Sequence, residues 1–247
     1  MRFVLVHGGY HGAWCWTKVI PELQALGHDV VAVDLPGAGE RVNEKATISS
    51  WRAAMAEVIQ DGDILVGHSM GGFVISLAAD EVPEKVGRLI FLSAAVPIEG
   101  MAMTDTTPID DYWTRITGLT FDQYAKVVDL PTQGSVIAMT SPDASNKLFY
   151  HDCSAEDQAW AFEHLTPLPM EATTTPLNLP RFWQAPIPRD YILCTDDRSH
   201  PIQWDNEFMQ RLGLSVNFGI ISSHSPFISR PTETAKLFDA CARGALQ

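Results

Sequence analysis

Short β-rich runs alternate with helical patterns through the first half of the chain, and this alternation constrains the fold most strongly. Strands buried on both faces are predicted at residues 3–6, 30–33, 64–66 and 89–92. Helices are predicted between them at residues 18–26, after a cap at Ser49 or Ser50, and at residues 70–80. Strands that alternate with helices form right-handed crossovers, so we expect a mostly parallel, doubly wound sheet.

The alternation stops near Pro97 and resumes near Tyr191. Scattered aromatic residues and then a proline-dense stretch fill the middle block, and those prolines cannot lie inside helices or central strands. The pattern returns with strands at 191–194 and 216–221 and helices at 202–212 and 232–242. We therefore predict an α/β core from residues 1–96 and 190–247, with an inserted, mainly helical cap at residues 97–189.

Length, composition and charge agree with one core that carries an insertion. The chain has 247 residues, 46% of them hydrophobic and 19% charged, which is a globular composition. Lys plus Arg number 17 against 30 for Asp plus Glu, a formal net charge of −13. Such a surface repels nucleic-acid phosphates and anionic lipid headgroups, so we expect no nucleic-acid partner and no membrane partner.

The cysteines and the first residues bear on the compartment. Cys15, Cys153, Cys194 and Cys241 are far apart and form no C-x-x-C pair, which favours free thiols over a zinc ribbon. The apolar run after Met1 is too short for a signal peptide, and no run reaches the roughly 18 residues of a membrane span. We expect a soluble cytoplasmic protein, and a homodimer is one assembly open to it.

The strongest motif for chemistry is Gly67-His-Ser-Met-Gly71, at the junction of a predicted strand and a predicted helix. A serine on a sharp strand-to-helix turn needs small neighbours, which Gly67 and Gly71 supply, and Gly72 lets the helix pack closely. The helix N-terminus adds positive potential near the hydroxyl. This context predicts that Ser69 is a nucleophile.

A serine hydroxyl needs a base, and a carboxylate must orient that base. For a serine at such a turn the order along the chain is Ser, acid, His, which points to His224 after the last predicted strand. Asp196 and Asp197 both follow the preceding strand. We favour Asp197 because Pro201 lies four residues on, the usual spacing in related hydrolases, and Asp196 stays the alternative.

The oxyanion of the tetrahedral intermediate needs two backbone N–H donors. Met70 follows the nucleophile and is expected to provide one. The loop after the first strand, with its glycines, is expected to provide the other through Gly9.

His7 and His11 are four residues apart but leave a strand, so we expect no metal site. Gly37-Ala-Gly39 lacks the third glycine of a dinucleotide fingerprint and the sequence has no P-loop, so we expect no cofactor. His200 lies close to the two aspartates in the sequence, so it could line the pocket, although we favour an exposed loop residue.

With these residues in place, the chain resembles the α/β-hydrolases of the branch that includes plant methylesterases, hydroxynitrile lyases and bacterial carboxylesterases such as pyrethroid-hydrolase-like members. The matching segments are residues 3–16 with H-G-A-W-C-W, Asp34-Leu-Pro-Gly37, residues 65–72, Cys194-Thr-Asp-Asp197, and His224 with Pro231. The resemblance spans nearly the whole chain except the middle block. It implies an α/β-hydrolase fold and a Ser69, His224 and Asp197 triad.

Two positions separate esterases from lyases in that branch. The S-selective lyases carry threonine after the first-strand histidine and lysine after the catalytic histidine, where this chain has Gly8 and Ser225. Another lyase lineage has asparagine where this chain has Gly8. The resemblance therefore implies the esterase type, and the ending His224-Ser-Pro-Phe227 is closer to the bacterial carboxylesterases than to the plant enzymes.

We therefore expect a serine carboxylesterase that acts on a small hydrophobic or aromatic ester through an acyl-enzyme. The expected pocket residues are Gly8, Tyr10, Trp113, Phe121, Trp160 and Ser225. A lactonase or a carbon–carbon bond hydrolase would use the same triad. A hydroxynitrile lyase and a non-catalytic receptor for a small molecule are the remaining alternatives.

Overall fold

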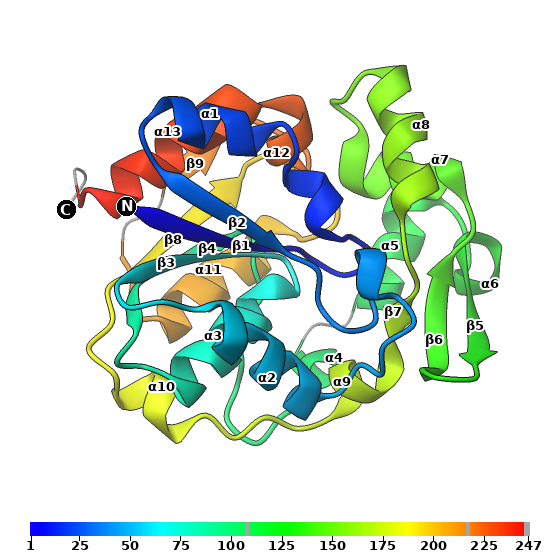
Figure 1. The fold of residues 1–247 in the computed structure, drawn as a ribbon. Helices are drawn as coiled ribbons and strands as arrows, with labels where there is room; N and C mark the ends of the chain where they lie inside the picture. The colour runs from blue at the N-terminus through cyan, green and yellow to red at the C-terminus, as the bar shows by residue number, and fades with distance from the viewer. Residues whose placement is uncertain (107–108, 216–217, 245–247) are drawn as a thin grey trace.

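A computed structural model describes residues 1–106, 109–215 and 218–244. Within these residues the core is a six-stranded, wholly parallel sheet (Figure 1). Its strands, in spatial order, are β2 (Asp29–Val33), β1 (Arg2–Val6), β3 (Asp63–His68), β4 (Val86–Leu92), β8 (Arg189–Cys194) and β9 (Phe218–Ile220). The parallel sheet confirms the predicted fold class. The first two residues of the predicted strand 216–221 lie outside the described residues.

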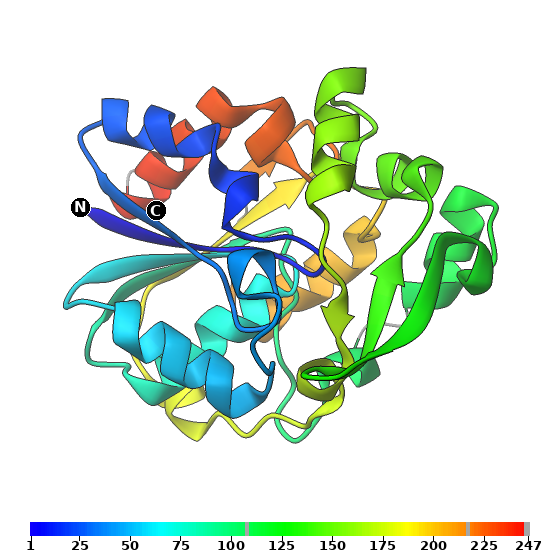
Figure 2. The ribbon, with the colours of Figure 1, turned by 45° about the vertical axis from the view of Figure 1, so that its right-hand side comes forward.

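Helices cover both faces of the sheet (Figures 1 and 2). One apolar layer contains residues of α2 (Ile48–Val58), α3 (Gly71–Glu81), α10 (Pro180–Gln184) and α11 (Ile202–Arg211). The other contains residues of η1 (Ala13–Trp16), α1 (Val19–Ala25), α12 (Pro226–Ser229) and α13 (Pro231–Ala242). Because helices bury both faces, the central strands are apolar on both sides, and β3 is buried along its whole length.

The N-terminus of α2 differs from the prediction. Thr47, and not Ser49 or Ser50, is the capping residue. Its hydroxyl accepts a hydrogen bond from the Ser50 N–H at 3.0 Å, and the Ser50 hydroxyl accepts one from the Thr47 N–H at 2.9 Å. This reciprocal pair satisfies two N–H groups that lack partners within the helix, so the helix starts two or three residues earlier than the predicted cap implies.

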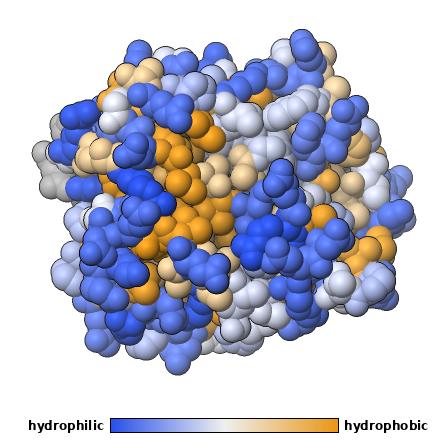
Figure 3. Space-filling view, in the orientation of Figure 1, coloured by the Kyte–Doolittle hydropathy of each residue, from blue (hydrophilic) through white to orange (hydrophobic). Residues whose placement is uncertain are grey.

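β2 is an edge strand, and its middle residues are only half buried. Figure 3 shows an apolar area left of centre, over this edge strand, with hydrophilic residues around it.

Among the described residues, no helix is both long enough and apolar enough to cross a bilayer.

The segment between β4 and β8 contains helices and a small antiparallel sheet. Its helices are α4 (Met103–Thr106), α5 (Ile109–Thr117), α6 (Phe121–Tyr124), α7 (Pro142–Ser145), the π-helical η3 (Asn146–Tyr150), α8 (Ala155–His164), α9 (Met170–Thr174) and α10. Its strands are β5 (Ala125–Leu130), β6 (Gly134–Met139) and β7 (Leu168–Pro169), paired in that order. These three strands differ from the expectation of a mainly helical segment.

The inserted segment lies in two places. Residues from α5 to β7 lie beside the carboxyl ends of the core strands, at the right of Figure 1, and come forward in Figure 2. The proline-dense part that follows instead runs along the core, where Leu177, Leu179 and Phe182 pack in the same apolar layer as α3. The part from α5 to β7 is therefore in a position to cover a site at the strand ends.

Candidate active site

Ser69 lies on a sharp turn between β3 and α3, with a φ of +52°. This left-handed conformation is uncommon for a residue with a side chain, so the neighbouring structure must hold it. A Cβ atom on Gly67 would lie 2.5 Å from the Gly71 carbonyl oxygen, and one on Gly71 would lie 2.6 Å from that of Val6. A Cβ atom on Gly72 would overlap the Ala95 carbonyl oxygen. The three glycines are therefore what allows the turn to close.

His224 and Asp197 meet at the carboxyl ends of β9 and β8. The His224 Nδ1–H donates to Asp197 Oδ2 at 2.6 Å, and both side chains are 2% exposed. The other carboxylate oxygen, Oδ1, accepts backbone N–H groups of Ser199 at 2.7 Å and His200 at 3.0 Å. Both oxygens thus have partners, which leaves His224 Nε2 as the nitrogen able to accept a proton.

The environment of Asp197 favours its ionised form. Burial alone would raise the pKa of this carboxyl, but its charge interaction and hydrogen bond with His224 and the backbone hydrogen bond from His200 outweigh burial. They bring the pKa below its ordinary value. A carboxylate that stays ionised in a buried position can stabilise an imidazolium on His224.

The structure separates the two adjacent aspartates. The Asp196 side chain is 60% exposed, and its carboxylate lies 3.5 Å from His151 Nε2, away from His224. Asp197 alone of the two faces the imidazole. This is the arrangement that the spacing to Pro201 favours.

His200 differs from the expectation of an exposed loop residue. Its side chain is buried, lines the same cavity as Ser69, and lies with its ring centroid 4.9 Å from that of His224. Burial, and then the nearby His224, lowers the pKa of His200 to about 4, so the ring is neutral near pH 7. Ser199, which donates to Asp197 from the same loop, lines the cavity as well. The loop folds inward because Asp197 Oδ1 binds two of its N–H groups.

His68, the residue before the serine, joins the serine turn to the histidine loop. Its Nε2–H donates to the backbone carbonyl oxygen of His224 at 2.8 Å, and the two rings lie 4.4 Å apart. Burial, followed by the proximity of His224 and His11, holds the pKa of His68 well below its usual range. His68 is therefore a neutral ring, which packs without adding a positive charge beside His224.

Gly9 and Met70 line the cavity next to Ser69. Met70 is the N-terminal capping residue of α3, so its backbone N–H belongs to the unsatisfied donors at that helix end. Gly9 comes from the loop after β1. Two backbone segments that are 61 residues apart in the sequence thus meet at one side of the serine.

A cavity of about 370 Å³ opens over Ser69 and His224. Its lining is mostly apolar and aromatic. The polar lining residues include Ser69 and the three histidines His11, His200 and His224. The residues that contribute from the inserted segment are Met103, Thr104, Asp111, Trp113, Phe121, Tyr124, Ile137, Phe149 and Leu168. Among the described lining residues there is no lysine and no arginine, and Asp111 is the acidic residue.

Three of the six predicted pocket residues line this cavity, namely Tyr10, Trp113 and Phe121. Gly8 does not, because it is enclosed between Ser69 and His68. Ser225 is completely buried beneath the histidine loop, where its N–H donates to Ser223 Oγ. Trp160 was expected in the pocket but instead packs edge-on against Trp14, with ring centroids 5.1 Å apart.

Sequence reasoning missed other cavity residues. Phe149 lies with its ring centroid 6.0 Å from that of His224, and Tyr124 and Leu168 line the cavity beside it. Their sequence neighbourhoods resemble those of ordinary buried aromatic and aliphatic residues. Only the path of the inserted segment turns them toward Ser69.

One group of side chains has a spacing that a metal ion could use. Ligand atoms of Asp197, His200 and His224 lie within 4.8 Å of one another. However, Asp197 Oδ2 and His224 Nδ1 already share a 2.6 Å hydrogen bond, so the group is fully accounted for as a buried histidine–carboxylate pair with a neighbouring imidazole. His7 and His11 each bond to backbone carbonyl groups and do not share a ligand site.

Comparison with known proteins identifies the family. The profile described as Alpha/beta hydrolase family matches residues 3–237. Norfluorocurarine synthase 2 of Strychnos sp is 30% identical, over 94% of this chain and 91% of its own length. Methylesterase 7 of Arabidopsis thaliana is 29% identical, over 96% and 94%.

Solved structures extend the comparison. The crystal structure of polyneuridine aldehyde esterase superposes with a TM-score of 0.78 at 28% identity, over 96% of this chain and 97% of that one. The match covers the inserted segment as well as the core. The chain therefore belongs to the alpha/beta hydrolase family, in its plant methylesterase-like branch, and is an esterase-type hydrolase.

Proposed function

We propose that this protein is a cofactor-independent serine carboxylesterase in which Ser69 is the nucleophile, His224 the general base and Asp197 the residue that orients the imidazole. One observation carries the proposal. Ser69, held at a φ of +52°, and His224 line the same cavity, and His224 is hydrogen-bonded at 2.6 Å to the buried Asp197. The three residues come from separate parts of the chain. A hydroxyl, a base and an orienting carboxylate are the groups that ester hydrolysis requires.

In the first half of the proposed reaction, Ser69 Oγ attacks the ester carbonyl carbon while His224 Nε2 takes the hydroxyl proton. The carbonyl oxygen becomes an oxyanion, which accepts hydrogen bonds from the N–H groups of Gly9 and Met70. The bond between the carbonyl carbon and the alcohol oxygen then breaks. His224 returns its proton to the alkoxide, and an alcohol leaves from an acyl-enzyme on Ser69.

In the second half, water replaces the alcohol. His224 takes a proton from that water, whose oxygen attacks the acyl carbon, and the same two N–H groups hold the second oxyanion. The acyl carbon then separates from Ser69 Oγ, which recovers its proton from His224. The products are a carboxylic acid, an alcohol and the unchanged enzyme.

The lining of the cavity supports an uncharged substrate with a hydrophobic or aromatic half. Trp113, Phe149, Phe121 and Tyr124 present ring surface, and no lysine or arginine of the described lining could pair with an anion. We propose that the part of the inserted segment from α5 to β7 is a cap over Ser69, because these rings belong to it.

Gly8 and Ser225 favour hydrolysis over cyanohydrin cleavage. A Cβ atom on Gly8 would lie 2.8 Å from His68 Nδ1 and 2.9 Å from Ser69 Cβ, so this chain leaves no room for the threonine or asparagine of the lyase types. Ser225 is buried and uncharged, so it cannot stabilise a leaving cyanide as a lysine would. The esterase reading accounts for both positions.

The decisive experiment combines turnover and labelling. Wild-type protein should hydrolyse p-nitrophenyl butyrate and be labelled at Ser69 by a fluorophosphonate, whereas Ser69→Ala should lose both, with kcat lower by about 10⁴-fold or more. Near-normal turnover by Ser69→Ala would refute the proposal. Tight ligand binding without turnover would instead support a receptor, and product analysis on lactones and β-diketones would identify the hydrolase alternatives.

A further inference from the structure

The loop after β1 carries two buried histidines, His7 and His11, that the proposed triad does not use. Each ring bonds to a carbonyl oxygen of the loop itself. The His7 Nδ1–H donates to the Gly8 carbonyl at 2.8 Å, and the His11 Nδ1–H donates to the Gly9 carbonyl at 2.7 Å. A third carbonyl, that of Tyr10, accepts the Thr166 N–H at 2.8 Å. Three consecutive carbonyl groups around the Gly9 donor are therefore held, the first two by histidine rings of the loop and the third by Thr166 of the inserted segment.

These bonds matter because glycine supplies no conformational preference of its own. The Gly9 N–H and the Gly8 carbonyl share one planar trans peptide, so the direction of one sets the direction of the other. The Gly9 carbonyl fixes the next peptide plane. With both carbonyls held, the backbone torsions on either side of Gly9 are fixed, and its N–H points in one direction.

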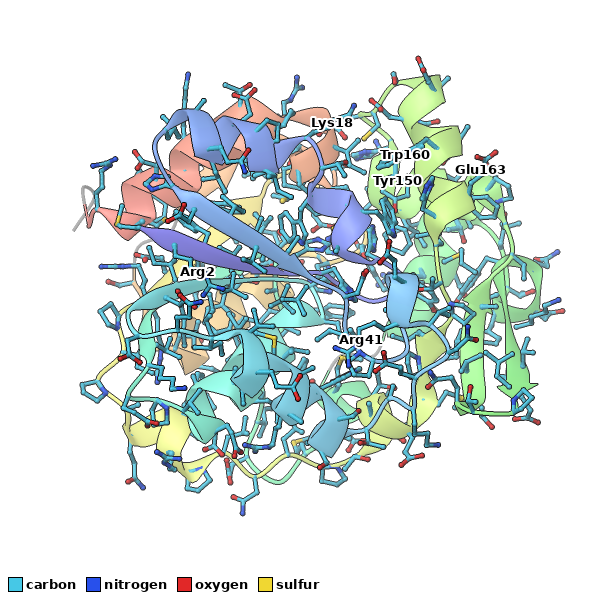
Figure 4. The ribbon with its side chains drawn as sticks, in the orientation of Figure 1. Arg2, Lys18, Arg41, Tyr150, Trp160 and Glu163 are labelled. Atoms are coloured by element: carbon cyan, nitrogen blue, oxygen red, sulfur yellow. The ribbon has the colours of Figure 1, made fainter. Side chains whose placement is uncertain are left out.

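The second nitrogen of His11 has a partner from the inserted segment. Because the Gly9 carbonyl can only accept, the hydrogen of this ring is on Nδ1, and Nε2 must accept the hydrogen bond from the Tyr150 hydroxyl at 2.7 Å. Tyr150 is completely buried at the end of η3 (Figure 4). His11 also stacks on Trp14, with an interplanar angle of 18°. The Gly9 carbonyl thus sets the tautomer, and the Tyr150 hydroxyl holds the other end of the ring in place.

Burial keeps both partners uncharged. It lowers the pKa of His11 to about 3 and raises that of Tyr150 well above its usual range. A neutral imidazole can bridge a hydroxyl donor and a carbonyl acceptor, whereas an imidazolium would have no lone pair for the Tyr150 hydroxyl. The bridge is therefore intact at neutral pH.

We infer that His11 is a positioning residue for the oxyanion hole, and that Tyr150 of the inserted segment fixes the orientation of its ring. The chain of contacts runs from the Tyr150 hydroxyl through the His11 ring to the Gly9 carbonyl. The inserted segment thereby does more than enclose the substrate, since it aligns one of the two oxyanion donors. This inference rests on the proposed function, because it concerns the Gly9 N–H as an oxyanion donor.

The test uses three substitutions that separate the two nitrogens of His11. Tyr150→Phe removes only the hydroxyl. His11→Asn keeps an N–H near the position of Nδ1, and His11→Gln keeps a polar group near Nε2 but loses the donor to Gly9. A matched control is Thr234→Val, which removes a buried hydroxyl on α13 that donates to the Arg230 carbonyl and does not line the cavity.

We expect Tyr150→Phe and His11→Gln to lower kcat for p-nitrophenyl butyrate about 10-fold to 100-fold. The loss of an entire oxyanion-hole donor lowers kcat by about 10²-fold to 10³-fold, and a misaligned donor should cost less. KM should change less than about twofold, and His11→Asn should keep more of kcat than His11→Gln. Affinity for an aryl trifluoromethyl ketone, whose adduct with Ser69 carries an oxyanion, should fall by the same factor as kcat/KM. Thr234→Val should leave all of these values unchanged.

A merely structural role gives a different pattern. In that case the variants would have a lower Tm than wild type. Their kcat, calculated per active site titrated with a fluorophosphonate, and their affinity for the ketone would match wild type. This result would overturn the inference. If the His11 variants do not fold, Tyr150→Phe decides alone. If wild-type protein shows no Ser69-dependent turnover, the proposed function fails, and the inference fails with it.

Discussion

The imidazole of His68 donates its Nε2–H to the backbone carbonyl of His224 at 2.8 Å and so ties the serine turn to the histidine loop. We expect His68→Leu to lower kcat about tenfold or more, because the His224 carbonyl loses its donor and the loop loses its register with Ser69. His68→Gln, which keeps an N–H of similar reach, should recover part of the loss. Steady-state kinetics on titrated active sites would check this, and an unchanged kcat in His68→Leu would contradict it.

A second prediction concerns the two adjacent aspartates. Asp197→Asn should lower kcat about 10⁴-fold, because an amide both removes the negative charge and favours the wrong imidazole tautomer. Asp196→Asn should stay within about twofold of wild type, because Asp196 is exposed and faces His151. The pair of variants differs by one position and is compared on p-nitrophenyl butyrate. A large loss in Asp196→Asn would reverse the assignment.

The core and the serine turn could be predicted because their signals are local. A run such as Ile64–Val66 followed by glycines around Ser69 specifies a buried strand, a tight turn and a helix start within ten residues. The pairing of Asp197 with His224 also followed from order and spacing along the chain. In each case, neighbouring residues contain the constraint.

The cap could not be predicted in the same way, because tertiary contacts decide its structure. β5 and β6 form a hairpin whose turn spans residues 131–133, and Gly134, the first residue of β6, has a φ of +73°. Each strand, however, is a short run of mixed polarity that also suits a helix or loop. Trp160 looks like any cap aromatic until Trp14 is found against it. The burial of His200 depends on the hydrogen bonds that Asp197 draws from its loop.

A third prediction concerns the two glycines after His7. Gly8→Ala should lower the free energy of unfolding by about 1–3 kcal/mol, because its Cβ would meet His68 Nδ1 at 2.8 Å and Ser69 Cβ at 2.9 Å, both held in place. Gly9→Ala should cost less than about 1 kcal/mol, since its Cβ would meet only the flexible end of Leu168 at 3.2 Å. Urea unfolding measures the free energy of unfolding of both variants. An equal loss of stability in Gly8→Ala and Gly9→Ala would contradict the close packing described around Gly8.

The charge of the substrate provides a fourth prediction. A p-nitrophenyl ester of glutarate with a free carboxylate should have a kcat/KM at least about 100-fold lower than its neutral methyl-capped analogue. A carboxylate buried in this cavity finds no lysine or arginine in the described lining, and an unpaired buried charge costs several kcal/mol. Asp111→Asn should reduce the difference in kcat/KM between the two esters only a few-fold, because Asp111 is exposed. Equal turnover of both esters would contradict an uncharged substrate.

A fifth prediction follows from the burial of His200, whose pKa is lowered to about 4. An unfolded histidine has a pKa near 6.5, so between pH 6.5 and 4 the unfolded chain binds a proton that the folded protein does not. Stability conferred by the neutral ring is therefore complete above pH 6.5 and is lost as the pH falls toward 4.

From pH 7 to pH 5 this group should cost the wild type about 2 kcal/mol of unfolding free energy. His200→Gln cannot take up that proton, so its stability should fall by about 2 kcal/mol less over the same interval. Urea unfolding of both proteins at pH 7, 6 and 5 measures the difference in slope, whatever the offset between the two curves. Parallel curves would mean that His200 can be protonated in the folded state, and that the ring is not enclosed beside His224 and Asp197 as described.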